Sequence, residues 1–493
     1  MREAREVVKV RAAEAKLMAA LPAGTLMQRA ATGLAAVCGQ LLGRRYGSRA
    51  VVLAGSGDNG GDALYAAAQL ARRGTAVLAV GAGSRIHDGG AAALRAAGGR
   101  ITGPDDPAVA AAIEQADLIL DGMLGIGGKG GLREPYATLA AAAAQSAATV
   151  VAVDLPSGVD ADTGEVAGAA VRADVTVTFG TWKPGLLIDP GASYAGTVEL
   201  IDIGLGPLLP APAVRALQAA DVAALLPRPA PESDKYRRGV LGLLAGSEQY
   251  TGAAVLAAGS AIYGGAGMVR LMSAPLPLAA ARQRWPELVT AAADPAAPDK
   301  SVKTAGRVQA WAAGPGMGTD DGAAGLLAAV LATSLPALVD ADGITIAARQ
   351  PALLRRDAPT LITPHAGELA RLTGADRADI EARRLEHATA AAADLGVTVL
   401  LKGSTTVIAD PGGIVLVNST GSSWLATAGS GDVLSGLAGS LLAQGLPPLQ
   451  AAAAAAYLHG IAARLAARDA PIGAADLITA LPDAIRTVAA AEA

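Results

Sequence analysis

Apolar residues in the first half of the chain form short continuous runs, with helix-like segments between most of them. Two helices are expected at the start, over Glu3–Ala20 and Thr25–Gly43. The strand-like runs that follow are Ala50–Ala54, Ala76–Val80, Asp117–Leu120, Thr149–Val153 and Val175–Phe179. Alternating strand and helix signals predict a parallel sheet with helices on both faces. In such a sheet, ligands bind at the carboxyl ends of the strands.

The second half of the chain repeats this pattern with different residues at the strand ends. The segments in which a strand is expected to run into a glycine or polar turn are Gly239–Ser247, Ala312–Gly318, Ala337–Ile344, Leu361–Leu369 and Val399–Ala409. An apolar helix is expected over Val433–Leu442, directly after a glycine-rich turn. The fold class predicted for each half is therefore a three-layer α/β/α domain.

A proline-rich segment separates the two halves. Prolines at positions 207, 210, 212, 227, 229 and 231 bracket one short helical piece, a composition typical of a linker. We place the junction near residue 215, which divides the 493 residues into domains 1–214 and 215–493.

The composition excludes several classes of function. A net charge of -4 does not indicate a protein that binds nucleic acids or membrane surfaces. The one cysteine, Cys38, excludes an internal disulfide and a cysteine-based metal site. The apolar runs Leu139–Val153 and Ala451–Leu465 are rich in alanine and interrupted by polar residues, so neither is a convincing membrane span. Residues 1–16 are charged and lack the apolar core of a signal peptide, so we expect a cytoplasmic protein.

Three loops after strands of the first half carry residues capable of chemistry: GSGDNGGDA at Gly55–Ala63, DGMLGIGGKGGLREPY at Asp121–Tyr136 and DLPSGVDADTG at Asp154–Gly164. The first departs from the spaced glycine fingerprint of dinucleotide-binding folds. Asn59, Asp121 and Ser157 are oxygen donors in three separate loops, suited to a monovalent cation or Mg²⁺. Each alone is also a common turn residue, but three at one sheet edge favour a cation site.

The stretch TAGSGDVLSG, Thr427–Gly436, is a glycine-rich turn that opens a helix. Unpaired N–H groups and the positive end of the helix dipole form an anion seat there. Asp432 lies in this seat. It is either an ordinary N-cap or a base that takes a proton from a hydroxyl about to attack a phosphorus atom. The Lys-Gly-Ser-Thr-Thr hairpin upstream, Lys402–Thr406, favours the second reading.

Other polar residues at strand ends leave alternatives open. His365 follows a strand and precedes a helix, so it either contacts a ligand or caps the helix. Asp340 and Asp342 either position Mg²⁺ through water or cap the next helix. The remaining histidines have no such setting and are taken as structural: His87, His387 and His459.

The three loops of the first half, together with LMQRA at Leu26–Ala30, resemble the motifs of the NAD(P)H-hydrate epimerase family over about residues 5–210. The resemblance implies a Rossmann-like domain in which Asn59, Asp121 and Ser157 hold a potassium ion and Asp154 is the acid/base. The residues implied to contact the hydrated dinucleotide are Asp58, Asn59, Gly60, Gly61, Asp62, Gly125, Ile126, Gly127, Gly128, Lys129, Gly130 and Gly131.

Two positions depart from that family's pattern. Asp58 stands where the family commonly has Asn, and Ala63 stands where it commonly has Gly. The extra negative charge of Asp58 near an anionic ligand is expected to weaken binding. Neither departure removes a presumed catalytic group.

The second half resembles the ADP-dependent NAD(P)H-hydrate dehydratases of the ribokinase superfamily over about residues 220–490. The motifs that carry the resemblance are KYRRG, GSEQYTGAA, GPGMG, DADGI, TPHAGEL, KGSTT and ATAGSGDVLSG. It implies that Ala253, Gly316, His365 and Asp432 bind the hydrated dinucleotide. The residues implied to bind the adenine nucleotide, used with Mg²⁺, are Lys402, Gly403, Ser404, Thr405, Thr406 and Gly431.

Together the two resemblances imply repair of hydrated NADH and NADPH (NADHX and NADPHX) by epimerisation and ADP-dependent dehydration. A homo-oligomer, a tetramer or larger, is expected by the same resemblance. One alternative is a small-molecule kinase of the ribokinase superfamily with a regulatory N-terminal half. Another is a first half that only binds nucleotide or protein without catalysing a reaction.

Overall fold

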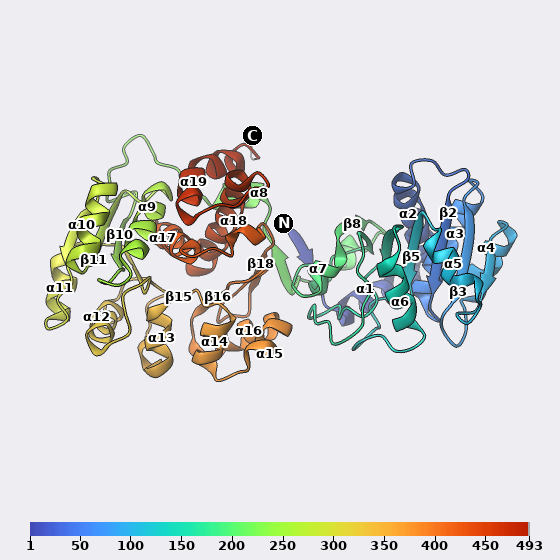
Figure 1. Cartoon of the computed structure of the whole chain (residues 1–493), viewed down its shortest axis with the longest axis horizontal. Coiled ribbons are helices and arrows are strands. Elements are labelled where there is room, and N and C mark those ends of the chain that lie inside the picture. The colour runs from blue at the N-terminus through green and yellow to red at the C-terminus, as the bar shows by residue number, and fades with distance from the viewer. Residues whose placement is uncertain (492–493) are drawn as a thin grey trace. The chain divides into compact units, whose positions relative to one another are not determined.

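The computed structural model describes residues 1–491 (Figure 1). The chain separates into two compact units. One is Glu3–Val214, and the other contains residues 215 onward together with Met1 and Arg2. The Met1 ammonium forms an ion pair of 2.8 Å with Asp221 inside the second unit. Within residues 1–491, no helix combines the length and the apolar character needed to cross a membrane.

The first unit is built on a seven-stranded sheet with the order β4-β3-β2-β5-β6-β7-β8, in which every neighbouring pair is parallel. Its strands are β2 (Arg49–Ala54), β3 (Ala76–Gly81), β4 (Arg100–Thr102), β5 (Leu118–Gly122), β6 (Thr149–Val153), β7 (Val175–Phe179) and β8 (Thr197–Ile201). Its helices are α1 (Val7–Ala20), α2 (Thr25–Leu41), α3 (Asp58–Ala71), α4 (Asp88–Ala96), α5 (Ala108–Glu114), α6 (Tyr136–Gln145) and α7 (Ala192–Ala195).

Alternate strand residues of this sheet feed two separate cores. Val52 and Leu120 pack with the apolar residues of α2 and α3. Val51 and Ile119 pack with those of α5 and α6 on the other face. Successive side chains of a strand point to opposite faces of the sheet, so each face has its own core. The result is the three-layer arrangement expected for the first half.

The other sheet has eleven strands in the order β1-β9-β18-β17-β16-β15-β14-β13-β10-β11-β12, and its strands from β10 onward lie in the second unit. Neighbours are parallel from β12 to β16, and β16-β17-β18 are antiparallel. The strands are β1 (Arg2–Ala4), β9 (Val214–Ala216), β10 (Val240–Leu244), β11 (Met268–Ser273), β12 (Val289–Ala292), β13 (Ala310–Ala313), β14 (Ala337–Val339), β15 (Thr360–Ile362), β16 (Thr398–Leu401), β17 (Thr406–Ala409) and β18 (Val415–Asn418).

The helices of this unit are α8 (Ala219–Leu225), α9 (Thr251–Tyr263), α10 (Pro275–Arg284), α11 (Pro298–Ala305), α12 (Asp321–Leu331), α13 (Asp342–Arg349), α14 (Ala366–Thr373), α15 (Arg377–Ala382), α16 (Arg384–Leu395), α17 (Ser430–Ala443), α18 (Pro448–Ala467) and α19 (Ala474–Ala489). Helices α9, α17, α18 and α19 share one core with the sheet (Figure 1). Small residues permit close approach in this core. A Cβ at Gly436 of α17 would lie 2.0 Å from the carbonyl oxygen of Ala257 in α9.

The predicted fold class is confirmed for both halves, and three local assignments are wrong. Glu3 lies in the strand β1 and not in a helix, because α1 begins only at Val7, whose amide donates to Asp162 Oδ1 at 2.7 Å. Asp58 already begins α3, so half of the first glycine-rich loop is helical. Asp121 lies inside β5 and not in the loop after it, since its backbone continues the pairing with β6.

Candidate active sites

Asp154 follows β6 directly and adopts a backbone φ of 65°, a left-handed conformation that aspartate tolerates better than most residues. Its Oδ1 atom accepts hydrogen bonds from Thr178 Oγ1 at 3.0 Å and from the Phe179 amide at 3.2 Å. The same oxygen forms an ion pair with the Lys183 ammonium. The carboxylate that the sequence singled out is therefore buried against the end of β7 and paired with a cation.

Lys183 was missed by sequence reasoning, although its side chain is only 1% exposed. Its ammonium also donates to Thr178 Oγ1 at 2.9 Å and to the Phe179 carbonyl at 3.1 Å, so it is fully bonded in the interior. The available signal was its position: it stands four residues after Phe179, the end of a predicted strand. The loop that contains Lys183 follows a strand of the parallel sheet, as do the three loops identified as candidates from the sequence.

Asp121 and Ser157 are brought together as predicted from the strand ends. Ser157 Oγ donates to Asp121 Oδ1 at 2.6 Å, and the Ser157 amide donates to Asp121 Oδ2 at 2.8 Å. Asp121 is completely buried, and burial raises its pKa to about 6 although the Ser157 hydroxyl and amide oppose the rise. The carboxyl group makes no ion pair with a cationic side chain in the described chain.

Asn59 lies near Asp121 and Ser157 but does not contact them directly. A Cβ at Gly125 would be 3.0 Å from Asn59 Oδ1, so the Asn59 side chain faces the loop that follows β5. Gly125 adjoins Leu124, whose amide donates to Ser157 Oγ at 2.9 Å. All three predicted cation ligands therefore contact one loop, but only Asp121 and Ser157 contact each other directly.

In the glycine-rich loop Gly125–Gly131, Gly127, Lys129 and Gly130 are exposed and the other residues are partly buried. Gly127 approaches α1, since a Cβ there would lie 2.9 Å from Arg11. Gly131 packs directly on the backbone of Gly168. The loop thus leaves room beside the carboxyl ends of β2 and β5.

A pocket of about 540 Å³ lies beside the first turns of α3. Its polar lining includes Asp58, Asp62, Glu14 and His87, with Phe179 on the apolar side. Burial raises the pKa of Asp62 well above its ordinary value, and the negative charges of Asp154 and Asp58 add to the rise. Burial also raises the pKa of Glu14, a pocket residue that sequence reasoning missed.

In the second unit, Asp432 lies in the first turn of α17. The N-cap of that helix is Gly429, with a φ of 86°, so Asp432 is not the cap. Within residues 1–491, hydrogen bonds are recorded for the Ser430 and Val433 amides and none for those of Gly431 and Asp432. Two amides at the start of a helix are thus available to an anion.

The electrostatic setting of Asp432 is unusual for a carboxylate. Burial raises its pKa to about 7, and the negative charges of Asp340 and Asp342 add to the rise while Lys402 opposes it. A group with a pKa near the working pH is suited to accepting a proton during a reaction.

Lys402 joins two carboxylates beside this helix start. Its ammonium lies 2.8 Å from Asp340 Oδ1 and 3.7 Å from Glu368 Oε2. Ser435 Oγ donates to the other Asp340 oxygen at 2.6 Å. Burial would raise the pKa of Asp340, but Lys402 and the neighbouring hydroxyls outweigh it and lower that pKa. The buried aspartate therefore stays ionised and holds Lys402 in place.

The structure excludes one of the two roles left open for Asp340 and Asp342, that of a helix cap. The N-cap of α13 is Ala341, and no side chain caps the helix. Asp342 Oδ2 instead accepts a hydrogen bond from the Gly318 amide at 2.9 Å. Neither aspartate is therefore a helix cap, and Asp340 ties β14 to Lys402 and to α17.

His365 is the N-cap of α14 and also lies beside Lys402. Its Nδ1 accepts from the Glu368 amide at 3.2 Å, and Glu368 Oε2 accepts from the His365 amide at 2.8 Å. Burial lowers the pKa of His365, and the nearby Lys402 cation adds to the effect although Glu368 opposes it. The side chain is about half exposed, and its other ring nitrogen, Nε2, lies 3.5 Å from Glu368 Oε1.

The remaining predicted residues of this unit lie in two regions: Ala253 and Gly316 lie together, and the others lie in the hairpin Lys402–Thr406. Gly316 contacts Ala253 and Tyr250, since a Cβ on the glycine would be 2.8 Å and 2.7 Å from their Cβ atoms. A pocket of about 600 Å³ opens there, lined in part by Tyr250, Gly318 and Asp342. The negative charge of Asp342, which lines this pocket, adds to the raised pKa of Asp432.

The Lys-Gly-Ser-Thr-Thr hairpin connects β16 to β17. Gly403 and Ser404 are exposed, Thr405 is buried and Thr406 begins β17. Arg384 donates to the Lys402 carbonyl at 2.7 Å, and a Cβ at Gly403 would overlap its guanidinium. A Cβ at Gly431 would be 3.6 Å from the Lys402 ammonium, so the hairpin and the helix start are adjacent.

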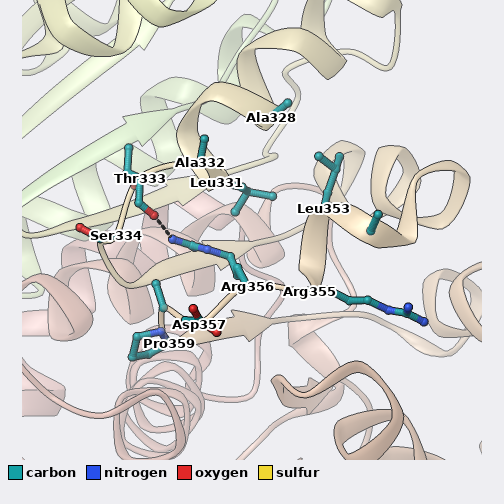
Figure 2. A pocket seen from close by; sticks show the side chains of 12 residues that line it. Ala328, Leu331, Ala332, Thr333, Ser334, Leu353, Arg355, Arg356, Asp357 and Pro359 are labelled. Atoms are coloured by element: carbon teal, nitrogen blue, oxygen red, sulfur yellow. Dashed lines mark hydrogen bonds between the residues drawn. The ribbon is translucent and has the colours of Figure 1, made fainter.

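A third cavity of about 680 Å³ lies at the opposite edge of the sheet, between the end of α12 and the residues before β14 and β15 (Figure 2). Arg356 reaches across it to the carbonyl of Thr333 and donates to that of Leu335 at 2.8 Å. None of the residues predicted for the site lines this cavity. The candidate chemistry is therefore confined to the carboxyl ends of the strands.

Comparison with known proteins agrees with this division. A family described as YjeF-related protein N-terminus matches residues 23–185, and the NAD(P)H-hydrate dehydratase family matches residues 241–486. An ADP/ATP-dependent NAD(P)H-hydrate dehydratase from Bacillus subtilis, co-crystallised with ATP/Mg²⁺, has 29% identity and a TM-score of 0.51, covering 56% of this chain and 99% of its own. A ribokinase-like superfamily protein from Enterococcus faecalis has 26% identity and a TM-score of 0.51, covering 56% and 97%.

Curated relatives also match nearly the whole length of the chain. The bifunctional NAD(P)H-hydrate repair enzyme Nnr of Mycobacterium leprae is 49% identical over 475 residues, which cover 95% of each chain. The chain belongs to the family of bifunctional NAD(P)H-hydrate repair enzymes, with an epimerase domain followed by a dehydratase domain.

Proposed function

We propose that the two sites act in turn on one damaged molecule, a reduced nicotinamide dinucleotide with water added across a ring double bond. The first unit interconverts the R and S forms at the hydroxyl-bearing carbon. The second unit removes the hydroxyl from the S form. The observation that carries this proposal is Asp432, a carboxylate placed beside free amides at the start of α17.

In the first unit, Asp154 exchanges the protons of the epimerisation. Its place after β6 and its contacts with Thr178 and Lys183 support this role. We assign binding of the dinucleotide to the glycine-rich segments 58–62 and 125–131, which border the same sheet edge. In the second segment Gly127 and Gly130 are exposed, which would let a phosphate approach the backbone closely, whereas Gly60 and Gly61 of the first segment are buried in α3.

A potassium site fits the residues of the first unit. Asp121 is a buried carboxyl group without a cationic partner in the described chain, and Ser157 and Asn59 add neutral oxygens around the same loop. A bound monovalent cation would neutralise that carboxylate and bind oxygen atoms of the substrate. We assign the cation to Asn59, Asp121 and Ser157.

In the second unit, Asp432 accepts the proton of the ring hydroxyl as that oxygen attacks the terminal phosphorus of the nucleotide. The amides of Gly431 and Asp432 stabilise the charge on the transferred phosphoryl group. Phosphate is a better leaving group than hydroxide, and the ring nitrogen's electron pair assists its departure. Ala253, Gly316 and His365 are assigned to the dinucleotide side of the site.

The nucleotide is assigned to Lys402–Thr406 and Gly431. The ATP/Mg²⁺ complex of the Bacillus subtilis relative supports a nucleotide and Mg²⁺ in this unit. Mg²⁺ bound to the phosphates would neutralise their charge. We propose ADP as the nucleotide and a homo-oligomer, a tetramer or larger, as the assembly.

The test is to supply the full chain with mixed R and S hydrate, ADP and Mg²⁺ and to follow the absorbance of reduced nicotinamide. Complete recovery of both forms is expected. Recovery that stops when the S form is used up would show that the first unit is only a binding module. Accumulation of a phosphorylated product would instead favour the small-molecule kinase.

A further inference from the structure

The hydrogen bonds to Asp154 are distributed unevenly between its two oxygens. Thr178 Oγ1, the Phe179 amide and the Lys183 ammonium all donate to Oδ1, and no donor to Oδ2 is recorded in the described chain. Lys183 is buried and its remaining contacts are with β7, so its orientation is fixed. One oxygen of the carboxylate is thus anchored by a cation while the other is left to react.

Asp62 has the opposite environment. It lines the 540 Å³ pocket, and its buried Oδ1 atom has no hydrogen-bond partner within residues 1–491. An ionised carboxylate without donors is costly to bury, so the protonated form is favoured. Burial and the charges of Asp154, Asp58 and Glu14 raise its pKa, as described above.

The other titratable groups around the pocket do not relieve this charge. Lys183 is engaged by Asp154. His87 lines the pocket, but its Nδ1 accepts from the Gly90 amide at 3.0 Å, so the ring is engaged as the N-cap of α4. Two carboxyl groups with opposed environments in one site are the usual arrangement of a general base and a general acid.

We propose that Asp62 is the general acid of the epimerisation and that Asp154 is its general base, with Lys183 as the residue that positions Asp154. This inference rests on the epimerase function proposed for the first unit. It adds a second proton-transferring group to a site in which sequence reasoning recognised one, and it gives a role to a lysine that sequence reasoning missed.

The step balances with water as the co-reactant. Asp62 gives its proton to the ring hydroxyl, the carbon–oxygen bond breaks, and the ring nitrogen's electron pair forms a carbon–nitrogen double bond as water leaves. A second water attacks the same carbon from the opposite face and gives a proton to Asp154, which restores the nitrogen's electron pair. Exchange with solvent returns the proton from Asp154 to Asp62.

The test measures R-to-S conversion by the full chain with NADHX, while ADP-dependent loss of the S form reports on the second unit. Asp62→Asn should lower kcat for epimerisation by about 10²–10⁴-fold and leave dehydration unchanged. In the wild type, epimerisation should fall at alkaline pH as Asp62 loses its proton, and the residual activity of Asp62→Asn should lack that fall. Asp105→Asn, a matched change on an exposed loop, should alter neither reaction.

Lys183→Met should lower kcat for epimerisation at least tenfold with little change in KM, because Asp154 loses its orientation and not its contact with substrate. Lys16→Met, at an exposed position of α1, is its control. Should Asp62→Asn fail to fold, Asp62→Glu decides, since it should keep activity with a displaced alkaline limb. Unchanged epimerisation in Asp62→Asn, an unchanged profile in Asp62→Glu, or a larger loss from Glu14→Gln would overturn the assignment. A wild type that dehydrates but never epimerises would instead refute the function proposed for the first unit.

Discussion

The two aspartates proposed to act in the two units lie in different local structures and in opposed environments: Asp154 directly follows the strand β6, and Asp432 lies in the first turn of the helix α17. Asp154 is paired with a buried cation and anchored through one oxygen. Asp432 lies beside two unbonded amides, with the cation Lys402 engaged mainly by Asp340. The comparison teaches that the environment of an aspartate depends on which group engages the nearest lysine: Lys183 pairs with Asp154 itself, whereas Lys402 pairs with Asp340 and leaves Asp432 with a pKa raised by burial to about 7.

The substitution with the largest expected effect is Asp432→Asn, which should separate the two activities. Loss of the proton acceptor should reduce S-form dehydration by about 10²–10⁴-fold, while R-to-S conversion continues. Reduced-nicotinamide absorbance measures the first, and chromatographic separation of the R and S forms measures the second. If both reactions disappear, the assignment of one activity to each unit is wrong.

The reciprocal change is Asp154→Asn. R-to-S conversion should fall by a similar factor, because the anchored base is gone, while dehydration of the S form with ADP is unaffected. The same two measurements apply. A variant that still consumes the R form at the wild-type rate would contradict the role of Asp154.

The pH dependence of dehydration sharpens the difference between the two carboxylates. Asp432 must be ionised to accept a proton, and its pKa is about 7. The rate should therefore fall about tenfold per pH unit below that value and level off above it. Stopped assays of the S form between pH 5 and 9 measure the profile, which an amide at this position should flatten.

The folding stability of the second unit should decrease as the pH rises, whereas the dehydration rate should increase. Because the folded state raises the pKa of Asp432 above its ordinary value, the carboxylate lowers stability as pH rises from about 4 to about 7. Asp432→Asn should relieve a cost on the order of 4 kcal/mol at pH 8 and much less at pH 5, from about three pKa units at 1.36 kcal/mol each. Thermal unfolding of the second unit at both pH values measures it, and a stabilisation that is equal at both would exclude this cause.

The smallest expected effect concerns the departure at Asp58. Asp58→Asn removes an exposed negative charge beside the proposed dinucleotide contacts, so the KM of epimerisation should fall a few-fold at low ionic strength. Raising the salt concentration should shrink the difference between the variant and the wild type. An increase in KM would show that the aspartate contributes to binding.

Several features of the sites followed from the sequence because strand ends in parallel sheets meet at one edge. Asp121 and Ser157, 36 residues apart, form hydrogen bonds as that reasoning predicts. The placement of Asp432 in a helix start followed from the glycines before it. The sheet order was not readable, because strand pairing depends on contacts between distant segments and leaves no local pattern.

Other residues could not be found in this way. Lys183 looks like any surface lysine until the fold encloses it against Asp154. Glu14 lies on a helix whose pocket-facing side depends on how α1 packs. Glu368 looks like an ordinary capping-box residue, and only the tertiary structure places its carboxylate 3.7 Å from Lys402.

The contact between Gly436 and the Ala257 carbonyl has a consequence for the dehydratase unit. Helix α9 carries Ala253 near its start, and α17 carries Asp432 near its own. The two helices touch about one turn beyond these residues, where no methyl group fits. The separation between Ala253, a proposed dinucleotide contact, and Asp432, the proposed proton acceptor, therefore depends on the missing side chain at position 436, and even alanine there would force the two helices apart.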